Sequence, residues 1–346
     1  MMRALYHVTI PDWPMANCEA VMQDIQALRR IAPGDSFHFY PARSPGTRIP
    51  RRLWGLNRLP AIWRAERSAD FHHIFNPDPF PFPALHLLRR PIVYTVLGGV
   101  KDDHRRMAQQ LARLARAIIV SSEDDLIRLR GWGISQSCFI QPAIDASRFS
   151  YSPPPRGAPF TLLAGSAPWT PEQFGSKGVN ALLKAAQQRR DLRIIFLWRG
   201  VLFAEMMRRV GAMGVEMQVQ VFNEPMDVNR LLAQAHAGVV LAERSDLVKA
   251  YPHSLLESLA AGKPVLISRA IPMSAWVEHL GLGVVVEQVT VEGALAAVDA
   301  LRSRADAFPP EKLRAAVAHQ SGRFLEQHRR VYHGVIAAQR DPAPNG

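Results

Sequence analysis

Short hydrophobic runs alternate along the chain with longer segments in which hydrophobic residues recur every three or four positions. The short runs are typical of buried strands and the longer segments of amphipathic helices. In the first half, strands are predicted at 4–8, 36–40, 71–75, 91–96 and 117–120, and helices at 19–30 and 105–116. In the second half, strands are predicted at 160–164, 193–197, 217–221, 237–241, 265–267 and 283–286, and helices at 179–189, 228–235 and 292–302. The alternation predicts an α/β protein with parallel sheets covered by helices on both faces.

The pattern is interrupted at residues 151–159, where Tyr-Ser-Pro-Pro-Pro-Arg-Gly-Ala-Pro carries no hydrophobic periodicity. Such a Pro-rich segment is stiff and contributes little to a core. A chain of 346 residues also exceeds the usual size of one core. We therefore predict a first domain over 1–150, a linker over 151–159 and a second domain over 160–320. The last amphipathic segment, 311–338, has no strand after it, and the tail 341–346 is expected to be disordered.

Residues 252–268 combine helix, turn and strand signals around a single carboxylate. Leucines recur at helical spacing from 255 to 259, Gly262 and Pro264 end the helix, and a short buried strand follows. Glu257 is the only charge within this helix, and Ser254 is placed to cap its first turn. The N–H groups of that turn favour an anion. The alternative is a helix that only packs, with one solvated glutamate.

Composition and charge limit the possible partners, metal sites and location of the chain. The net charge of +12 is consistent with an anionic partner such as a nucleotide phosphate or lipid headgroups, and equally with a solvated arginine-rich surface. No zinc-finger, RRM or helix-turn-helix signature is present, so we expect no nucleic acid partner. Cys18 and Cys138 lie far apart without metal-ligand spacing and are expected to be inert thiols. No run of 18 or more hydrophobic residues is present, so a cytoplasmic location is expected.

The 252–268 segment resembles the C-terminal signature of family-4 glycosyltransferases, the glycosyl transferases group 1, which are retaining enzymes of the GT-B fold. Residues 116–123, 131–134 and 140–149 resemble, in the same order, the segments of this family that lead into the linker between the two domains. The resemblance covers about residues 90 to 290. It implies two Rossmann-like domains facing a cleft, the first on the acceptor side, and a C-terminal helix at 321–340 that packs back on the first domain.

The same resemblance implies a chemistry. The chain would transfer a sugar from a UDP- or GDP-linked donor to an acceptor glycan, lipid or small molecule, with retention and without a cofactor or required metal. The carboxylate matched by Glu257 would hold the ribose hydroxyls, because a carboxylate can accept both hydrogen bonds of a vicinal diol. Ser254 and Leu255, with the backbone N–H groups of the helix start, would contact sugar or phosphate oxygens.

The segment that begins at Gly165-Ser166 and ends at Lys177-Gly178 resembles the family's phosphate-binding loop. Lys177 matches the loop's lysine, and Ser166 stands where its arginine belongs. Arg199 follows a predicted strand and is the candidate for the second cation. Fixed cations stabilise the charge that develops on a leaving diphosphate.

Other positions depart from the family pattern. The family has a glutamate eight residues before the one matched by Glu257, and this chain has Lys249 there. Lys249 is a candidate catalytic residue that can bind a donor phosphate or an acidic sugar, and Glu243 or Asp246 can supply the carboxylate if the loop is longer. Leu97 takes the place of a family histidine. These departures leave a second hypothesis open, a nucleotide-sugar-binding or assembly subunit without turnover.

His72 and His73 lie at the predicted end of a strand, so His73 is a candidate catalytic residue. The alternative is that one of the two packs inward while the other is solvated.

The segment Arg48 to Arg67 interleaves arginine with Leu, Ile and Trp. This mixture suits an anionic membrane surface and predicts peripheral attachment at the inner face of the membrane. A basic helix with an inward apolar face explains it equally well.

Overall fold

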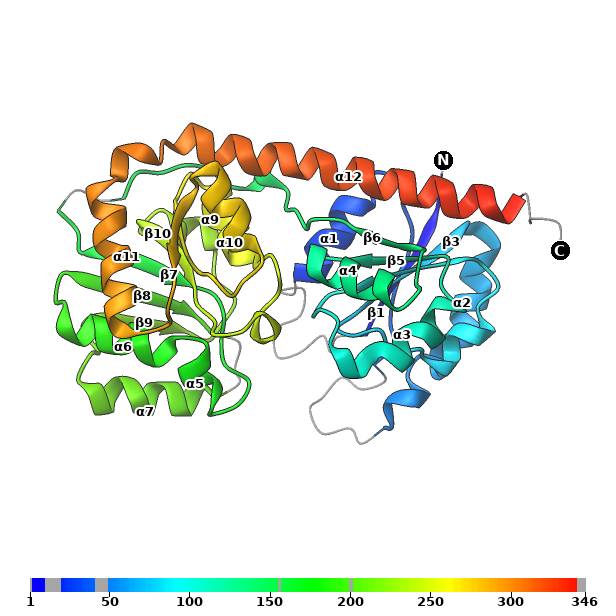
Figure 1. Ribbon diagram of the computed structural model, residues 1–346, viewed down its shortest axis with the longest axis horizontal. Coiled ribbons are helices and arrows are strands. Elements are labelled where there is room, and N and C mark those ends of the chain that lie inside the picture. The colour runs from blue at the N-terminus through cyan, green and yellow to red at the C-terminus, as the bar shows by residue number, and fades with distance from the viewer. Residues whose placement is uncertain (1, 10–19, 41–48, 155–156, 199–201, 341–346) are drawn as a thin grey trace. The chain divides into compact units, whose positions relative to one another are not determined.

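The computed structural model describes residues 2–9, 20–40, 49–154, 157–198 and 202–340. The chain divides into two compact units, Met1–Pro142 with Gly322–Gly346, and Ala143–Ser321. Each unit contains a parallel sheet of six strands with helices packed against it (Figure 1). The predicted α/β class is confirmed.

The first unit is built on a sheet with the strand order β2-β1-β3-β4-β5-β6. Its strands are β1 (Ala4–Val8), β2 (Ser36–His38), β3 (Phe71–Asn76), β4 (Ile92–Val96), β5 (Ala117–Val120) and β6 (Ser137–Phe139). Its α-helices are α1 (Ala20–Leu28), α2 (Leu59–Ala65), α3 (Arg105–Ala112), α4 (Glu123–Gly131) and the last part of α12 (Pro310–Arg340). Four short 3₁₀ segments of this unit carry residues discussed later, η1 (Arg51–Leu53), η3 (Glu66–Ser68), η4 (Pro83–Leu87) and η5 (Asp102–His104).

The second unit has the strand order β12-β11-β10-β7-β8-β9. Its strands are β7 (Phe160–Ala164), β8 (Leu192–Leu197), β9 (Val219–Phe222), β10 (Ala237–Val240), β11 (Val265–Ser268) and β12 (Gly283–Val286). Its α-helices are α5 (Gln173–Ser176), α6 (Val179–Gln188), α7 (Phe203–Met213), α8 (Val228–Leu232), α9 (His253–Ala260), α10 (Met273–Leu280), α11 (Val291–Ser303) and the start of α12. Helix α6 packs against α7 and α11, while α9 and α10 pack against β10, β11 and β12.

The division between the units lies at Pro142, whereas the sequence placed it at residue 150. The residues between these points include η6 (Ala146–Arg148), which is held by α8 of the second unit. Asn229 of α8 donates its Nδ2 to the carbonyl of Arg148 at 2.9 Å, and its Oδ1 accepts from the amide of Ser150 at 3.4 Å. These hydrogen bonds attach the segment to the second core before the Pro-rich stretch begins.

Strand β3 is central to the first sheet and is buried on both faces. All six of its residues are buried, because α12 packs over one face through Tyr332 and a large hydrophobic cluster covers the other. A polar side chain in such a strand must find its hydrogen-bond partners inside the protein. The two histidines of β3 satisfy this requirement on opposite faces.

On the face away from α12, His72 belongs to a chain of three buried side chains. Its Nε2 lies 2.7 Å from Oε1 of Glu66, and its Nδ1 lies 2.8 Å from Nε2 of His7. Because an ionised carboxylate only accepts, His72 donates to Glu66 and accepts from His7. Burial opposes ionisation of Glu66, but the hydrogen bonds from His72 and from the amide of Arg89 outweigh it and lower the pKa of this carboxyl.

We predict that Glu66→Gln lowers the free energy of unfolding of the first unit by about 1–3 kcal/mol, because His72 and the Arg89 amide lose a charged acceptor. The pKa of Glu66 is 4.5 in the unfolded chain and lower in the folded protein. The ionised carboxylate therefore stabilises the folded state fully above pH 4.5, and this stabilisation is lost as the pH falls through the folded pKa. Urea titrations of wild type and variant should therefore differ most near neutral pH and converge in acid.

Glu326→Gln is the matched control, because Glu326 lies on α12 in the same unit with its side chain 46% exposed. Its exposed ion pairs with Arg329 and Arg330 contribute little. Equal losses in the two variants, or a Glu66→Gln effect that persists in acid, would contradict the assignment.

Candidate functional site

The second sheet reverses its winding between β7 and β10, which are neighbours although two strands separate them in the chain. In an open parallel sheet, ligands bind at the carboxyl ends of the strands at such a switch point. The segment after β7 begins with Gly165, and the segment after β10 leads to α9. The switch point therefore brings two of the predicted binding segments together.

Helix α9 lies very close to β7 and β10 because a glycine directly after β7 and a glycine within β10 face it. A Cβ on Gly165 would lie 2.6 Å from Cβ of Ser254, and a Cβ on Gly238 of β10 would lie 2.2 Å from Oγ of Ser258. The two serines are four residues apart, so they lie on one face of the helix. The hydroxyl of Ser258 donates back to the carbonyl of Ser254 at 2.9 Å. Two glycines and two small side chains thus fix the start of α9 at the carboxyl edge.

The residues of α9 differ from the expectation in one respect. The helix begins at His253 with Pro252 as its N-cap and no side-chain capping bond, so the prediction that Ser254 caps the first turn is wrong. Leu255 is fully buried, and its amide donates to the carbonyl of Pro252 at 3.1 Å. Glu257 is 8% exposed, within a helix whose other residues are buried except for the half-buried Ser254.

Lys177 lies between α5 and α6 and is 5% exposed. Its Nζ donates to the carbonyl of Ala167 at 3.0 Å, which ties the ammonium group to the loop after β7. Gly178 follows with a φ of +68°, and a Cβ there would lie 2.7 Å from Cβ of Leu241, just beyond β10. The amide of Glu243 donates to the carbonyl of Ser176 at 2.8 Å. Lys177 is therefore held between the segments that follow β7 and β10. The half-buried Ser166 lies in the segment that follows β7.

The segment between β10 and α9 contains the residues at which the chain departs from the family pattern. Lys249 is half-buried, and Glu243 is exposed. Asp246 is bound by Arg244 through two hydrogen bonds of 3.0 Å. The candidate second cation, Arg199, lies outside the described residues.

His73 is not placed as the sequence predicted, because it lies in the middle of β3 and is fully buried. Its Nδ1 lies 2.8 Å from the hydroxyl of Tyr332, and its Nε2 lies 2.7 Å from Oγ1 of Thr95. Burial and the neighbouring His328 hold the pKa of His73 well below its usual range, so the ring is neutral. The prediction of a catalytic His73 is therefore corrected: the side chain is a structural group of the core. His72 is buried as well, so neither histidine is solvated.

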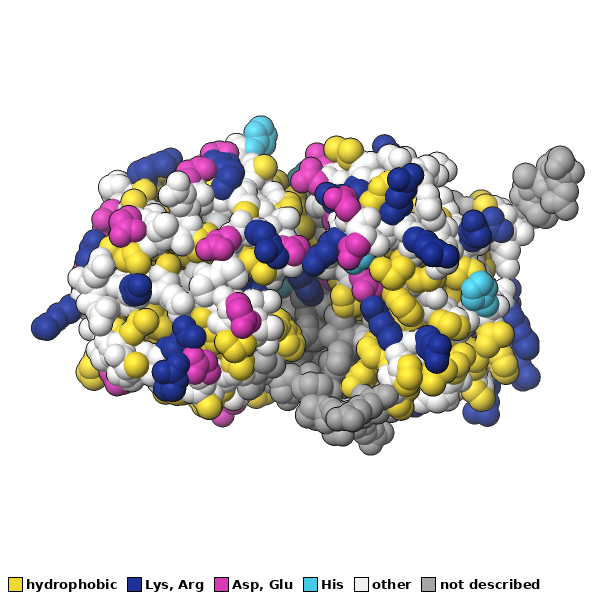
Figure 2. Space-filling model, turned by 60° about the horizontal axis from the view of Figure 1, so that its bottom comes forward, with side chains coloured by type: hydrophobic (Ala, Val, Ile, Leu, Met, Phe, Trp, Pro, Cys, Tyr) yellow, Lys and Arg dark blue, Asp and Glu magenta, His cyan; other side chains and the backbone are white. Residues whose placement is uncertain are grey.

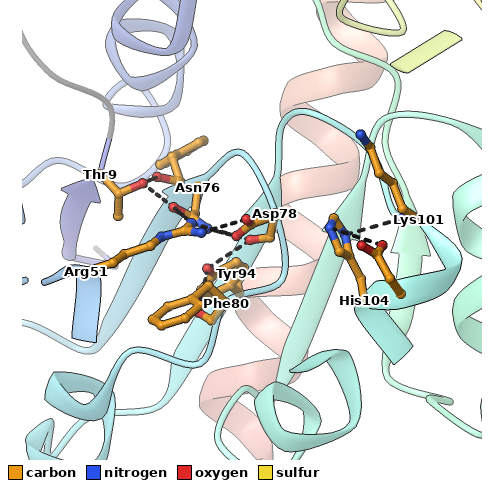
Figure 3. Close-up of polar contacts among 10 residues, drawn as sticks. Thr9, Arg51, Asn76, Asp78, Phe80, Tyr94, Lys101 and His104 are labelled. Carbon is orange, nitrogen blue, oxygen red and sulfur yellow. Dashed lines mark hydrogen bonds and ion pairs between the residues drawn. The ribbon is translucent and has the colours of Figure 1, made fainter. Parts of the chain in front are cut away.

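The first sheet has its own switch point, between β1 and β3, and a polar cluster lies there that the sequence reasoning missed (Figure 3). Arg51 of η1 donates to both carboxylate oxygens of Asp78 at 2.7 and 2.6 Å, and to Oδ1 of Asn76 at 3.2 Å. Asn76, the last residue of β3, donates to Oδ1 of Asp78 at 2.8 Å and is hydrogen-bonded on its other side to Thr9, just after β1. We name Thr9, Arg51, Asn76 and Asp78 the Arg51–Asp78 cluster.

A sequence signal for this cluster was available. Asn76-Pro77-Asp78 directly follows the predicted strand 71–75, and polar residues at the carboxyl end of a parallel strand are candidate ligands. The partner Arg51 is 27 residues away in the chain from Asp78, and no periodicity connects the two. Within the described residues, no group of three or more His, Cys, Asp or Glu side chains is arranged to hold a metal ion.

We predict that Gly165→Ala lowers the free energy of unfolding of the second unit by about 1–3 kcal/mol, because its methyl group would overlap Cβ of Ser254 and displace α9. Urea unfolding measures the effect. Ser254→Gly should relieve the overlap in the double variant, whereas Ser254→Ala, which keeps Cβ, should not. Strict additivity of Gly165→Ala with Ser254→Gly would contradict the proposed contact.

The second unit matches a known family, and the whole chain resembles solved structures in fold. Residues 173–317 match the family described as Glycosyl transferases group 1. No curated protein has a significantly similar sequence.

Among solved structures, HepE from Anabaena in complex with UDP is 17% identical, with 99% of this chain and 100% of that chain covered and a TM-score of 0.65. Sucrose-phosphate synthase from Thermosynechococcus elongatus is 15% identical, with 97% and 100% covered and a TM-score of 0.73. A glycosyltransferase from Rickettsia africae is 12% identical, with 97% and 99% covered and a TM-score of 0.72. These likenesses establish the GT-B fold of two α/β units, and within it residues 173–317 match the glycosyl transferases group 1.

Proposed function

We propose that this chain is a glycosyltransferase that moves a sugar from a UDP- or GDP-linked donor to an acceptor, with retention and without a required metal. The observation that carries the proposal is the convergence of the α9 start, the loop after β7 and the buried Lys177 at the switch point of the second sheet. This convergence lies within or beside the segment that matches the family. UDP is the first donor nucleotide to test, because HepE was crystallised with it.

In this proposal the donor is bound by the second unit. The first N–H groups of a helix have no acceptor one turn back, so the start of α9 at Ser254 is proposed to face the diphosphate or sugar oxygens. Leu255 supports this turn from behind, because its side chain is buried and its amide already donates to the carbonyl of Pro252. Gly165 and Ser166 form the adjoining loop. Glu257 accepts the ribose hydroxyls, because an ionised carboxylate offers several acceptor sites to a diol.

Lys177 supplies positive charge to the diphosphate as the bond to the sugar breaks. A lysine held in place by the carbonyl of Ala167 needs little reorganisation to do so, and it acts in a partly buried environment where charges interact strongly. Arg199 is proposed as a second cation, in place of the arginine that Ser166 replaces.

Lys249 is the departure from the family pattern that leaves an alternative to the enzyme open. As a cation it cannot stabilise positive charge on the sugar, and in this proposal it binds the donor phosphate or an acidic sugar. A nucleotide-sugar-binding or assembly subunit would bind the same donor without turnover. Release of UDP from a panel of UDP-sugars, with and without added glycan or lipid acceptors, distinguishes the two, because only the enzyme consumes donor.

Isothermal titration of the full chain with UDP and GDP tests the proposal, and we predict that Glu257→Ala weakens the binding about 10- to 100-fold. This is the range expected when charge-assisted hydrogen bonds are lost. Glu216→Ala is the control, because Glu216 is an exposed glutamate of the same unit outside α9. Failure of both nucleotides to bind, or an unchanged affinity in Glu257→Ala, would refute the donor site.

We further propose that the first unit attaches peripherally to an anionic membrane from the cytoplasmic side. No helix among the described residues has the length and hydropathy needed to cross a bilayer. Leu53 at the end of η1 and Leu87 at the end of η4 are 45% and 46% exposed, and these two segments contact each other. Exposed arginines surround them in the sequence, at positions 52, 58, 64, 67 and 89. Figure 2 shows hydrophobic side chains with Lys and Arg among them on the unit that carries α2 and α3. Arg48, at the start of the predicted segment, lies outside the described residues.

We predict that the protein sediments with vesicles of phosphatidylserine and phosphatidylcholine but not with phosphatidylcholine alone, and that added salt weakens the association. Replacing both Leu53 and Leu87 by Ser should reduce the bound fraction several-fold, because apolar area is lost from the interface. Ile127→Ser is the control, since Ile127 is 69% exposed on α4, whose first turn is acidic. Equal losses in the control and the double variant would contradict this surface.

A further inference from the structure

We infer that the Arg51–Asp78 cluster is a preformed binding site for the hydroxyl groups of a neutral carbohydrate, and that this carbohydrate is the acceptor. The second part of the inference rests on the proposed transferase function, and the first does not. The inference begins with position. The cluster joins the ends of β1 and β3, the switch point of the first sheet, where a parallel sheet exposes its functional groups.

The hydrogen-bonding capacity of the cluster exceeds what its own members use. A carboxylate offers about four acceptor positions and a guanidinium five N–H groups. Within the described part of the chain, Asp78 accepts two bonds from Arg51 and one from Asn76, and Arg51 donates three N–H groups in total. Among the described residues, one acceptor position of Asp78 and two N–H groups of Arg51 take no part in these bonds, and the two side chains are 23% and 33% exposed. A hydroxyl group both donates and accepts, so it matches a carboxylate and a guanidinium that lie side by side.

The charge of the cluster favours a neutral ligand. Burial opposes ionisation of Asp78, but the hydrogen bonds and charge of Arg51 outweigh it and hold the pKa of this carboxyl below its usual range. Arg51 and Asp78 therefore form an ion pair with no net charge. A phosphate or carboxylate that approached Arg51 would meet the negative charge of Asp78, whereas a sugar hydroxyl meets no such repulsion. The preferred charge of the ligand is therefore different from that in the second unit, where Lys177 and a helix start favour a diphosphate.

The cluster is also rigid before any ligand binds. The guanidinium carbon of Arg51 lies 4.5 Å from the ring centroid of Phe80 and 5.4 Å from that of Phe82, so the aromatic rings hold it in place. The hydroxyl of Tyr94 donates to the carbonyls of Asp78 and Phe80 at 3.2 and 3.0 Å, which fixes the loop that carries the carboxylate. Figure 3 shows Arg51 directed between Asn76 and Asp78 with Phe80 beside it. Side chains fixed in this way lose little entropy on binding.

The test uses the full chain and saturation-transfer NMR with methyl glycosides of glucose, galactose and mannose as neutral probes. Glucose 6-phosphate serves as the anionic probe. We expect at least one neutral glycoside to bind. Glucose 6-phosphate should displace this glycoside only poorly. Asp78→Asn and Arg51→Lys should each weaken that binding about 10-fold, since the first removes the charged acceptor and the second the bidentate donor.

Asp102→Asn is the matched control. Asp102 lies in the same unit, with its side chain 94% exposed and paired only at the surface with Arg128 at 3.1 Å. The control should bind the glycoside as wild type does, and thermal unfolding establishes that each variant is folded. If Asp78→Asn lowers the unfolding temperature sharply, Arg51→Lys supplies the comparison, because it keeps the charge that balances Asp78.

Three results would overturn the inference: no neutral glycoside binds wild type, folded Arg51→Lys binds as tightly as wild type, or glucose 6-phosphate binds more tightly than every neutral probe. UDP titration of the same samples separates the two proposals. Glycoside binding without UDP binding keeps the carbohydrate site and refutes the donor site. UDP binding that is unchanged in Asp78→Asn, together with lost glycoside binding, supports both.

Discussion

The close approach of α9 to β7 and β10 is the contact on which the second unit's proposed site depends. A helix normally stands off a sheet by the thickness of its side chains, but here Gly165 and Gly238 lie beneath Ser254 and Ser258. The short separation carries the first turn of α9 to the edge at which both strands end. Lys177 reaches the same edge because its Nζ binds the carbonyl of Ala167 and the next residue, Gly178, packs against Leu241. A helix start and a cation are thereby held together without a bound ligand.

The two units share one sheet topology but carry different residues at its switch point. In each sheet the strands are parallel, so the residues that follow them gather at one edge, and ligands of such sheets bind at the switch point. The second unit places a lysine and a helix start there, which suits a charged diphosphate. The first places a balanced ion pair there, which suits hydroxyl groups. In the proposed function these preferences correspond to a charged donor and a neutral acceptor.

Strand β3 shows how much depends on the position of a residue along a strand. His72 and His73 lie inside the strand, where side chains cover both faces, and they serve the core. Asn76 lies at its carboxyl end, where the strand leaves the sheet, and it takes part in the Arg51–Asp78 cluster. The buried chain from Glu66 through His72 to His7 and the contacts of His73 with Tyr332 and Thr95 meet the polar requirements of a strand that water does not reach.

The sequence by itself determined the α/β class and most of the strands, because buried strands and amphipathic helices leave periodic patterns in the order of residues. Strands β1, β5, β7 and β12 lie where the pattern put them, whereas the three-residue β6 is too short to produce one. The motif around Glu257 also pointed to the family that residues 173–317 match, since its helix, turn and strand are adjacent in the chain. Burial of His73, the packing of Ser254 on Gly165 and the pairing of Arg51 with Asp78 were decided only by the tertiary structure. Each of these depends on which distant segments meet, and a local pattern of residues carries no record of that.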